Sequence, residues 1–359
     1  MSSKQDIGNT FTRESGEIHL GGIDALVRLT LDQVRTDARR GLKTGMFVSG
    51  YRGSPVGMLD AALIKQQKLL LEHHIKFVDG LNEDLAATAV WGTQMMHTVG
   101  KQKFDGVTGM WYGKAPGVDR SGDALKHANY TGIGKNGGVL AIVGDDPSCK
   151  SSSLCSQSEP MLFHVGIPSL YPANVQEILD YGLHGYNMSR NAGVWVGMKI
   201  VTNVADGTGT ASVDPSRLNF VTPDMMFDGQ KFTPNMNLGM NVRVEALEME
   251  QSLYTRRLEV AKRYARENKL NNVIFPNPNA WLGIMTAGKT YNDLRQAFLE
   301  MGLDDDALRH YGIRILKMGM LFPMEPTIVR EFAEGLEEIF VIEEKRPFLE
   351  MFAKQVLYG

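Results

Sequence analysis

The sequence has little cysteine, no long apolar run and no excess of either charge. Its 359 residues include two cysteines, Cys149 and Cys155. Two thiols exclude a disulfide scaffold, and they also exclude a self-contained iron–sulfur cluster, which usually takes four thiolates. No apolar stretch approaches the ~18 residues of a membrane-spanning helix, and the polar start of the chain shows no signal-peptide pattern. We therefore expect a cytoplasmic protein with no membrane partner.

The balance of charge argues against nucleic acid as a partner. Lysine and arginine number 38 against 41 aspartates and glutamates, which gives a net charge of −3. A protein that binds phosphate backbones usually carries a basic excess. Hydrophobic residues make up 43% and charged residues 22%, an ordinary globular composition that excludes disorder or coiled coil for most of the chain.

Strand and helix patterns alternate along the first 200 or so residues. Runs such as Val139–Val143 are apolar throughout, which is typical of strands buried on both faces. The alternation predicts an α/β fold with a doubly wound, mostly parallel sheet. The predicted strands cover residues 44–49, 75–78, 107–112, 138–143 and 193–201, and the predicted helices cover residues 20–40, 58–72, 82–99, 123–130 and 173–188.

A second, smaller α/β unit follows a break in this pattern. Residues 206–241 are rich in Gly, Pro, Asn and Thr and have no clear period, which predicts an irregular excursion. We expect a first domain at 1–245, a connecting helix at 246–270 and a second domain at 271–359. The last residues, 351–359, resemble the end of a helix with no closing element, so we expect a fragment of a longer polypeptide or one chain of a larger enzyme.

Residues 283–290 fit the phosphate-binding loop pattern of NTPases, and Ile339–Glu343 stands in the place of the companion acidic strand. However, Gly283 lies inside an apolar run, so few residues remain to arch over a phosphate. We interpret the motif as a tight strand-to-helix turn, and a P-loop-type nucleotide-binding protein remains an alternative function.

The segment Gly144-Asp145-Asp146, with Asn174 further on, is a partial match to the diphosphate and Mg²⁺ motif of thiamine enzymes. That motif needs Gly-Asp-Gly, and the third position here is aspartate. We therefore do not assign a metal site to this chain.

Three polar loops follow successive predicted strands, at residues 50–55, 113–123 and 145–159. Ligands of open α/β sheets bind beyond the carboxyl ends of strands, so these loops together predict a site. Any one of these loops alone is better explained as a solvated turn. Glu83 begins the Ala-rich helix, where an acid is favoured by the helix dipole alone.

Taken together, these segments resemble the indolepyruvate ferredoxin oxidoreductase family of thiamine-diphosphate-dependent 2-oxoacid:ferredoxin oxidoreductases. The resemblance covers almost the whole chain. The first domain is similar to the family's aminopyrimidine-binding (PYR-type) domain, and residues 271–359 resemble its transketolase C-terminal-like domain. The segments that carry it are Tyr51–Pro55, Asn82-Glu83, Gly117–Asp119 with Asp123–Leu125 and Tyr130–Gly132, and Asp145–Pro147 with the serines after it.

The resemblance implies a catalytic, cofactor-binding role for Glu83. In such enzymes a buried glutamate hydrogen-bonds N1′ of the aminopyrimidine, which favours the imino form whose nitrogen removes the C2 proton of the thiazolium. The 2-oxoacid is then decarboxylated, electrons pass to ferredoxin, and coenzyme A takes the acyl group.

The same resemblance assigns the turn at residues 50–55 to cofactor and substrate. Gly53 and Ser54 are expected to bind the cofactor, and the Ser54 hydroxyl is also expected to bond the substrate carboxylate. Arg52 stands where the family often has proline, a departure that is expected to alter the substrate pocket. Lys114 and Arg120 are the cations expected to face that carboxylate.

Several parts of such an enzyme are missing from the sequence. The resemblance implies Mg²⁺, a diphosphate-binding domain and 4Fe-4S clusters in a longer chain or in partner subunits, and a homodimer. The expected substrate is an indolepyruvate-like aryl or branched 2-oxoacid. A non-catalytic scaffold chain remains a further alternative.

Overall fold

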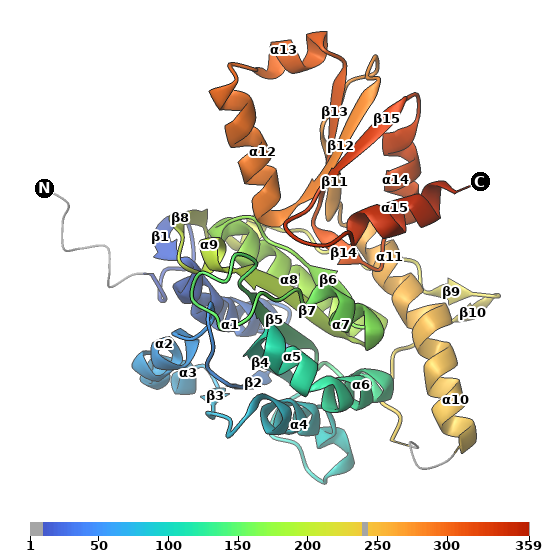
Figure 1. Cartoon of the computed structure of the whole chain (residues 1–359). Coiled ribbons are helices and arrows are strands. Elements are labelled where there is room, and N and C mark those ends of the chain that lie inside the picture. Colours follow the sequence, from blue (N-terminus) through green and yellow to red (C-terminus); the bar gives the residue numbers. More distant parts are fainter. Residues whose placement is uncertain (1–9, 239–242, 359) are drawn as a thin grey trace, which may run out of the picture.

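The computed structural model describes residues 10–238 and 243–358, which form two sheets with their helices (Figure 1). The larger sheet has the strand order β14-β6-β7-β5-β4-β2-β3, and every pairing is parallel except that of β14 with β6. Its strands are β2 (Thr44–Gly50), β3 (Ile75–Phe77), β4 (Gly106–Lys114), β5 (Val139–Asp145), β6 (Ser169–Leu170), β7 (Trp195–Val201) and β14 (Met320–Phe322).

Helices cover both faces of the larger sheet, which confirms the predicted doubly wound α/β fold. Side chains along β4 alternate between the faces. Met110 and Tyr112 pack on the side of the first group of helices, and Trp111 packs on the side of the second. The first group is α1 (Gly22–Arg39), α2 (Leu59–Lys65), α3 (Gln67–Glu72) and α8 (Val175–Ala192), and the second is α4 (Glu83–Gln94), α5 (Ala115–Arg120), α6 (Gly122–Thr131) and α7 (Glu159–His164).

The smaller sheet lies above the larger one in Figure 1 and has the order β11-β13-β12-β15. Strands β13, β12 and β15 run parallel, and β11 is an antiparallel edge strand. The strands are β11 (Asn271–Phe275), β12 (Leu282–Ala287), β13 (Ile313–Met318) and β15 (Glu338–Ile342), and the helices are α12 (Gly288–Glu300), α13 (Asp305–His310), α14 (Pro326–Ala333) and α15 (Leu349–Leu357). The βα alternation predicted from residue 271 onward is confirmed for β12, β13 and β15.

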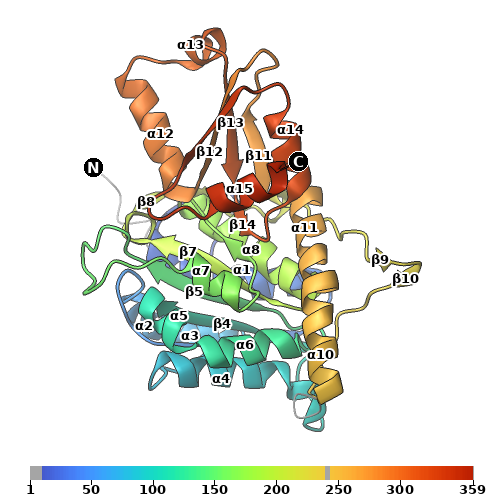
Figure 2. The same cartoon turned by 45° about the vertical axis from the view of Figure 1, so that its right-hand side comes forward.

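A long helix runs along the side of both sheets, as Figure 2 shows. It consists of α10 (Arg243–Ser252), a π-helical turn (Leu253–Arg257) and α11 (Leu258–Glu267), close to the predicted connecting helix. Arg257 is buried in the π-helical turn and donates to the carbonyl oxygens of Asn129 at 3.0 Å and Tyr130 at 2.9 Å. These bonds fix the long helix against α6.

A common hydrophobic cluster and one strand, β14, join the two units. Strand β14 belongs to the chain segment of the smaller unit, yet it pairs with β6 at the edge of the larger sheet, Met320 opposite Leu170. Phe322 packs edge-on against Phe163 of α7, with ring centroids 5.3 Å apart. Backbone pairing and aromatic packing therefore both hold the smaller unit against the larger sheet.

Three details differ from the predictions. Residues 17–21, expected in part as helix, form β1 (Glu17–Gly21), which pairs with β8 (Thr208–Ser212) from the predicted irregular excursion. A short hairpin, β9 (Met226–Phe227) with β10 (Gln230–Lys231), lies in the same excursion, and residues 239–242 lie outside the described residues. The predicted loop at 113–123 contains α5, because Pro116 in the first turn suits a helix start.

In the described ranges, 10–238 and 243–358, no helix is long and apolar enough to cross a membrane.

Candidate functional site

The three predicted loops lie side by side at one edge of the larger sheet. Strands β2, β4 and β5 are neighbours and run parallel, with Gly50 opposite Tyr112 and Lys114 opposite Gly144. Their carboxyl ends therefore reach the same edge of the sheet, where ligands of doubly wound sheets bind. The prediction that these loops are adjacent is confirmed.

Ser54 connects the turn after β2 to the loop after β5. Its hydroxyl lies 2.5 Å from the hydroxyl of Ser151, and its carbonyl oxygen accepts a bond from the Ser152 hydroxyl at 3.4 Å. Asp146 holds the loop in shape, because its carboxylate accepts from the amides of residues 150, 151 and 152 at 2.8–2.9 Å. Burial raises the pKa of the Asp146 carboxyl, but the hydrogen bonds from residues 150–152 outweigh this effect and lower the pKa to about 2.

Gly53 and Lys114 are in contact. A Cβ atom built on Gly53 would lie 2.7 Å from Cδ of Lys114, so the aliphatic part of the lysine covers the glycine. No larger residue fits at position 53 without moving that side chain. The structure thus places Lys114 beside the Ser54 turn.

Arg52 belongs to the turn at residues 50–55, but its side chain lies near two carboxylates. The Arg52 guanidinium is 64% exposed and lies 3.7 Å from the carboxylate of Asp60 and 3.8 Å from that of Asp79. Arg120 is exposed at the end of α5. Of the two cations predicted to face the substrate carboxylate, Lys114 is the one whose side chain covers Gly53 in the turn at residues 50–55.

Glu83 is buried at the first position of α4, with 6% of its surface exposed. Asn82 caps this helix by accepting from the amide of Leu85 at 2.9 Å, and the indole of Trp111 donates to the Glu83 carbonyl at 2.9 Å. Within the described part of the chain, the Glu83 carboxylate itself has no hydrogen bond or ion pair. A buried carboxylate without a partner is costly, and it commonly marks a functional group.

Two glycines leave the room that the Glu83 side chain occupies. A Cβ atom built on Gly117 would lie 2.6 Å from Oε1 and 2.5 Å from Cγ of Glu83, and one built on Gly113 would lie 3.3 Å from Cγ. Gly113 lies near the end of β4, and Gly117 lies in α5. The end of β4 and the start of α5 therefore together border the Glu83 side chain. The segment beginning at Gly117 was predicted as part of the site, but its contact with Glu83 was not.

A buried cluster of charges lies at the junction of the two units and was not predicted. The ammonium of Lys199 in β7 lies 2.7 Å from the carboxylate of Glu159, 3.7 Å from that of Asp145 and 3.2 Å from that of Glu344. It also lies 4.6 Å above the ring of Tyr171. The lysine inside an otherwise apolar strand pattern was the sequence signal for this cluster.

One lysine faces three carboxylates in this cluster, so the charges do not balance. Burial raises the pKa of Asp145 from its ordinary value of 3.8 to about 6, although Lys199 opposes the rise and Glu159 adds to it. The amide and hydroxyl of Ser158 donate to the same Asp145 oxygen, at 3.1 and 3.0 Å.

The raised pKa of Asp145 makes the free energy of unfolding depend on pH. Because the pKa is higher in the folded state, its contribution to stability is complete below about pH 4 and is lost as the pH rises through 6. Asp145→Asn keeps an acceptor for Ser158 and removes the charge. Relative to the parent, this variant should gain up to about 3 kcal/mol of unfolding free energy between pH 4 and 7.

Urea denaturation at a series of pH values measures this difference. Asp206→Asn, at an exposed position, is the control and should show no such trend. A difference between Asp145→Asn and the parent that stays flat with pH would contradict the prediction.

The Gly144-Asp145-Asp146 segment and Asn174 have structural roles. Asp145 belongs to the buried cluster, Asp146 shapes its own loop, and Asn174 caps α8 by accepting from the amide of Glu177 at 3.0 Å. Among the described residues, no group of three or more His, Cys, Asp or Glu side chains is placed so that it could hold a metal ion.

The segment at 283–290 has the geometry of a tight turn. Gly283 lies within β12, and α12 begins at Gly288, directly after that strand. The ammonium of Lys289 pairs with Asp293 one turn further along α12, and the Thr290 hydroxyl donates to the Ala287 carbonyl at 2.6 Å. The four-residue arch of a phosphate-binding loop is not formed.

Comparison with solved structures defines the class of fold. The chain aligns with a 2-oxoglutarate:ferredoxin oxidoreductase from Magnetococcus marinus with a TM-score of 0.64 and 16% identity, over 95% of this chain and 65% of that one. The chain thus shares the fold of the matched part of that 2-oxoacid:ferredoxin oxidoreductase.

Comparison of sequences is more specific. Residues 271–359 match the indolepyruvate ferredoxin oxidoreductase middle domain. The chain is 27% identical over 320 residues to indolepyruvate oxidoreductase subunit IorA of Methanothermobacter marburgensis and 25% identical over 349 residues to that of Methanothermobacter thermautotrophicus, covering 89% and 96% of this chain. These matches confirm the predicted resemblance to the indolepyruvate ferredoxin oxidoreductase family. The chain spans about half the length of these relatives, 46% and 49%.

Proposed function

We propose that this chain is the part of a thiamine-diphosphate-dependent 2-oxoacid:ferredoxin oxidoreductase that activates the cofactor through Glu83. The observation that carries the proposal is the buried Glu83 carboxylate, which has no partner among the described residues and lies against Gly113 and Gly117 at the carboxyl end of β4. We assign residues 1–245 to a PYR-type domain, 246–270 to its connecting helix and 271–359 to a transketolase C-terminal-like domain.

The residues present fit an aminopyrimidine ring. An acid that is buried, lacks a partner among the described residues and lies against Gly113 and Gly117 can accept a hydrogen bond from a ligand placed beside α4. When bound, thiamine diphosphate supplies a nucleophilic thiazolium carbon for the 2-oxoacid carbonyl. In that state the Glu83 carboxylate would hold the proton that it shares with the pyrimidine ring nitrogen.

The turn at residues 50–55 is the proposed substrate side of the site. The aliphatic part of the Lys114 side chain lies against Gly53, the residue before Ser54. A hydroxyl and an ammonium suit a carboxylate, because charge-assisted hydrogen bonds fix its position and orientation. We propose an indolepyruvate-like aryl or branched 2-oxoacid as the substrate.

The remaining parts of the reaction belong to other domains or subunits. We propose that Mg²⁺, the diphosphate group and the 4Fe-4S clusters are bound there, with ferredoxin as electron acceptor and coenzyme A as acyl acceptor, in a cytoplasmic, homodimeric enzyme. The turn geometry at 283–290 disfavours the nucleotide-binding alternative. The buried Glu83 carboxylate, which has no partner among the described residues, disfavours a purely structural scaffold.

The experiment is an assay of this chain assembled with its diphosphate-binding and iron–sulfur parts. Indolepyruvate should support coenzyme A-dependent reduction of ferredoxin or a viologen dye, and 2-oxoglutarate should support less. The chain alone should reduce neither acceptor. Activity of the isolated chain, or none with any 2-oxoacid in the assembled enzyme that binds thiamine diphosphate, would contradict the proposal.

Ser54 provides a second test. Ser54→Ala removes a hydrogen bond to a charged group, so KM for the 2-oxoacid should rise on the order of tenfold, while thiamine affinity stays nearly unchanged. Ser54→Thr keeps the hydroxyl and should retain the parent KM. If the alanine variant loses thiamine affinity and keeps its KM, Ser54 serves the cofactor and not the substrate.

A further inference from the structure

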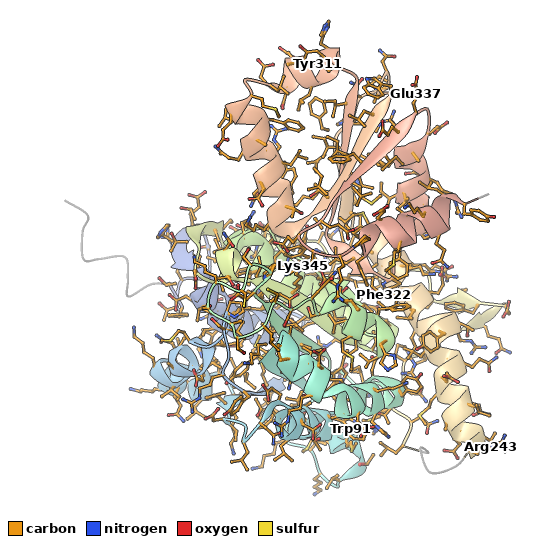
Figure 3. All side chains as sticks on the ribbon, in the orientation of Figure 1. Trp91, Arg243, Tyr311, Phe322, Glu337 and Lys345 are labelled. Carbon is orange, nitrogen blue, oxygen red and sulfur yellow. The ribbon has the colours of Figure 1, made fainter. Side chains whose placement is uncertain are left out.

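An arginine-lined cavity of about 550 Å³ lies between α1, α8 and the segment that follows β8. Helices α1 and α8 pack side by side on one face of the larger sheet (Figure 1), and their side chains are drawn in Figure 3. Helix α1 ends at Arg39, and β2 begins shortly afterwards at Thr44. The cavity therefore lies toward the amino edge of the sheet, whereas the candidate site lies at the carboxyl edge.

The lining of the cavity carries an excess of positive charge. Its charged residues are three arginines and one acid, namely Arg39, Arg40, Arg217 and Asp32. The Asp32 carboxylate is already paired with Arg28 at 2.9 Å and with Arg35 at 3.4 Å. Thr36 and Asn219 add uncharged hydrogen-bonding groups to the same lining. An anion that entered the cavity would therefore meet several donors and one acid that is already neutralised.

Helix α8 holds two of these arginines in place. The Asp180 carboxylate accepts from Nε of Arg217 at 2.8 Å, and the Asn187 side chain accepts from Arg40 at 2.8 Å. The Arg40 guanidinium also stacks on the ring of Phe220, 4.9 Å from its centre. Asp180 and Asn187 are seven residues apart on one helix, which is two turns or about 10 Å. The two arginines are thus tethered at two separate points along the cavity.

Both tethered arginines have hydrogen-bonding capacity left over. Nη1 of Arg217 donates to the Asp214 carbonyl at 3.0 Å, but Nη2 is buried and has no hydrogen-bond partner in the described part of the chain. Among the described residues, Arg40 makes one side-chain hydrogen bond and no ion pair. Arg39 pairs with Glu14 at 3.3 Å, but both side chains are exposed and such pairs are weak. Because a buried donor without an acceptor is costly, a bound anion would supply acceptors that the protein lacks.

We propose that this cavity is a binding site for a small polyanion that carries more than one phosphate group. Guanidinium groups bind phosphate oxygens through paired, charge-assisted hydrogen bonds. A single phosphate or carboxylate is small compared with the ~10 Å between the points that tether Arg40 and Arg217. A diphosphate or bisphosphate can contact both arginines, and Arg39 lies at the exposed mouth of the cavity.

Calorimetric titration of the full chain with pyrophosphate tests the proposal, at fixed ionic strength so that general screening stays constant. Pyrophosphate should bind at one site and more tightly than inorganic phosphate or citrate. Arg40→Gln should weaken it about tenfold or more, the usual effect of losing a charge-assisted hydrogen bond. Arg217→Lys keeps the charge beside Asp180 but loses the guanidinium fork, so it should also weaken binding. Arg263→Gln is the matched control, because Arg263 stacks on Phe227 at 4.3 Å but does not line the cavity.

Hydrogen exchange locates the bound pyrophosphate. Amides of residues 213–220 should exchange more slowly with pyrophosphate present, and those of the β9–β10 hairpin should not change. Equal affinity for phosphate and pyrophosphate, tighter binding of citrate, equal weakening by Arg40→Gln and Arg263→Gln, or no measurable binding would overturn the proposal. None of these outcomes depends on whether Glu83 activates a cofactor.

Discussion

Glu83→Gln in the assembled enzyme should lower 2-oxoacid oxidation by about 10²–10⁴-fold, the usual value of a positioned acid–base group. Glutamine keeps the size of glutamate and still fits against Gly113 and Gly117. It cannot take up and return a proton in the way a carboxylate does. Folding should survive, because the Glu83 carboxylate makes no bond to the described residues that the amide would lose.

Exchange of the cofactor's C2 proton for deuterium, followed by NMR, measures the affected step directly. It should slow in Glu83→Gln with thiamine diphosphate bound. Asp84→Asn is the matched control, because Asp84 is the other acid in the first turn of α4 and feels the same helix dipole. If both variants exchange at the parent rate, Glu83 is only a first-turn acid and the proton transfer belongs to another group.

Lys199→Met should lower the free energy of unfolding by about 3–5 kcal/mol at pH 7, as expected when one partner of a buried ion pair is removed. Methionine fills much of the space of lysine, so a cavity is not the cause. The loss comes from the carboxylates of Asp145, Glu159 and Glu344, which would remain buried without their cation. At pH 5 the loss should be smaller, because the buried carboxylates can then take up protons.

Chemical denaturation of parent and variant at both pH values tests this. Lys262→Met is the control, because Lys262 pairs with Glu259 at 3.1 Å on a partly exposed helix face, where such pairs contribute about 0.5 kcal/mol or less. If Lys199→Met lost the same unfolding free energy at pH 5 and pH 7, the loss would come from poorer packing and not from unpaired charge.

The sequence predicted the parallel part of the fold well because buried strands leave a clear pattern. Val139–Val143 is apolar at every position, and the structure buries all of β5. The antiparallel additions were not predicted, because their patterns are weak. Strand β8 reads Thr-Gly-Thr-Ala-Ser, with no apolar alternation, and β14 has three residues whose partner lies far away in the sequence.

In the candidate site too, some features could be predicted from the sequence and others could not. The positions of the loops follow from strand order, so their meeting at one edge could be predicted. The direction of a side chain depends on tertiary neighbours, and no local pattern shows that Arg52 lies near Asp60 and Asp79. Likewise, the reason for a glycine at position 117 is apparent only once Glu83 is found beside it.

The pairing of β14 with β6 has a consequence for synthesis of the protein. Leu170 emerges from the ribosome long before its partner Met320, so the larger sheet has an open edge while the whole smaller unit is being made. Open edges pair readily with other chains. A nascent or truncated chain that ends near residue 270 should therefore be prone to aggregation and to chaperone binding, and the complete chain should not. Expression of the larger unit alone would then require that this edge be covered or redesigned.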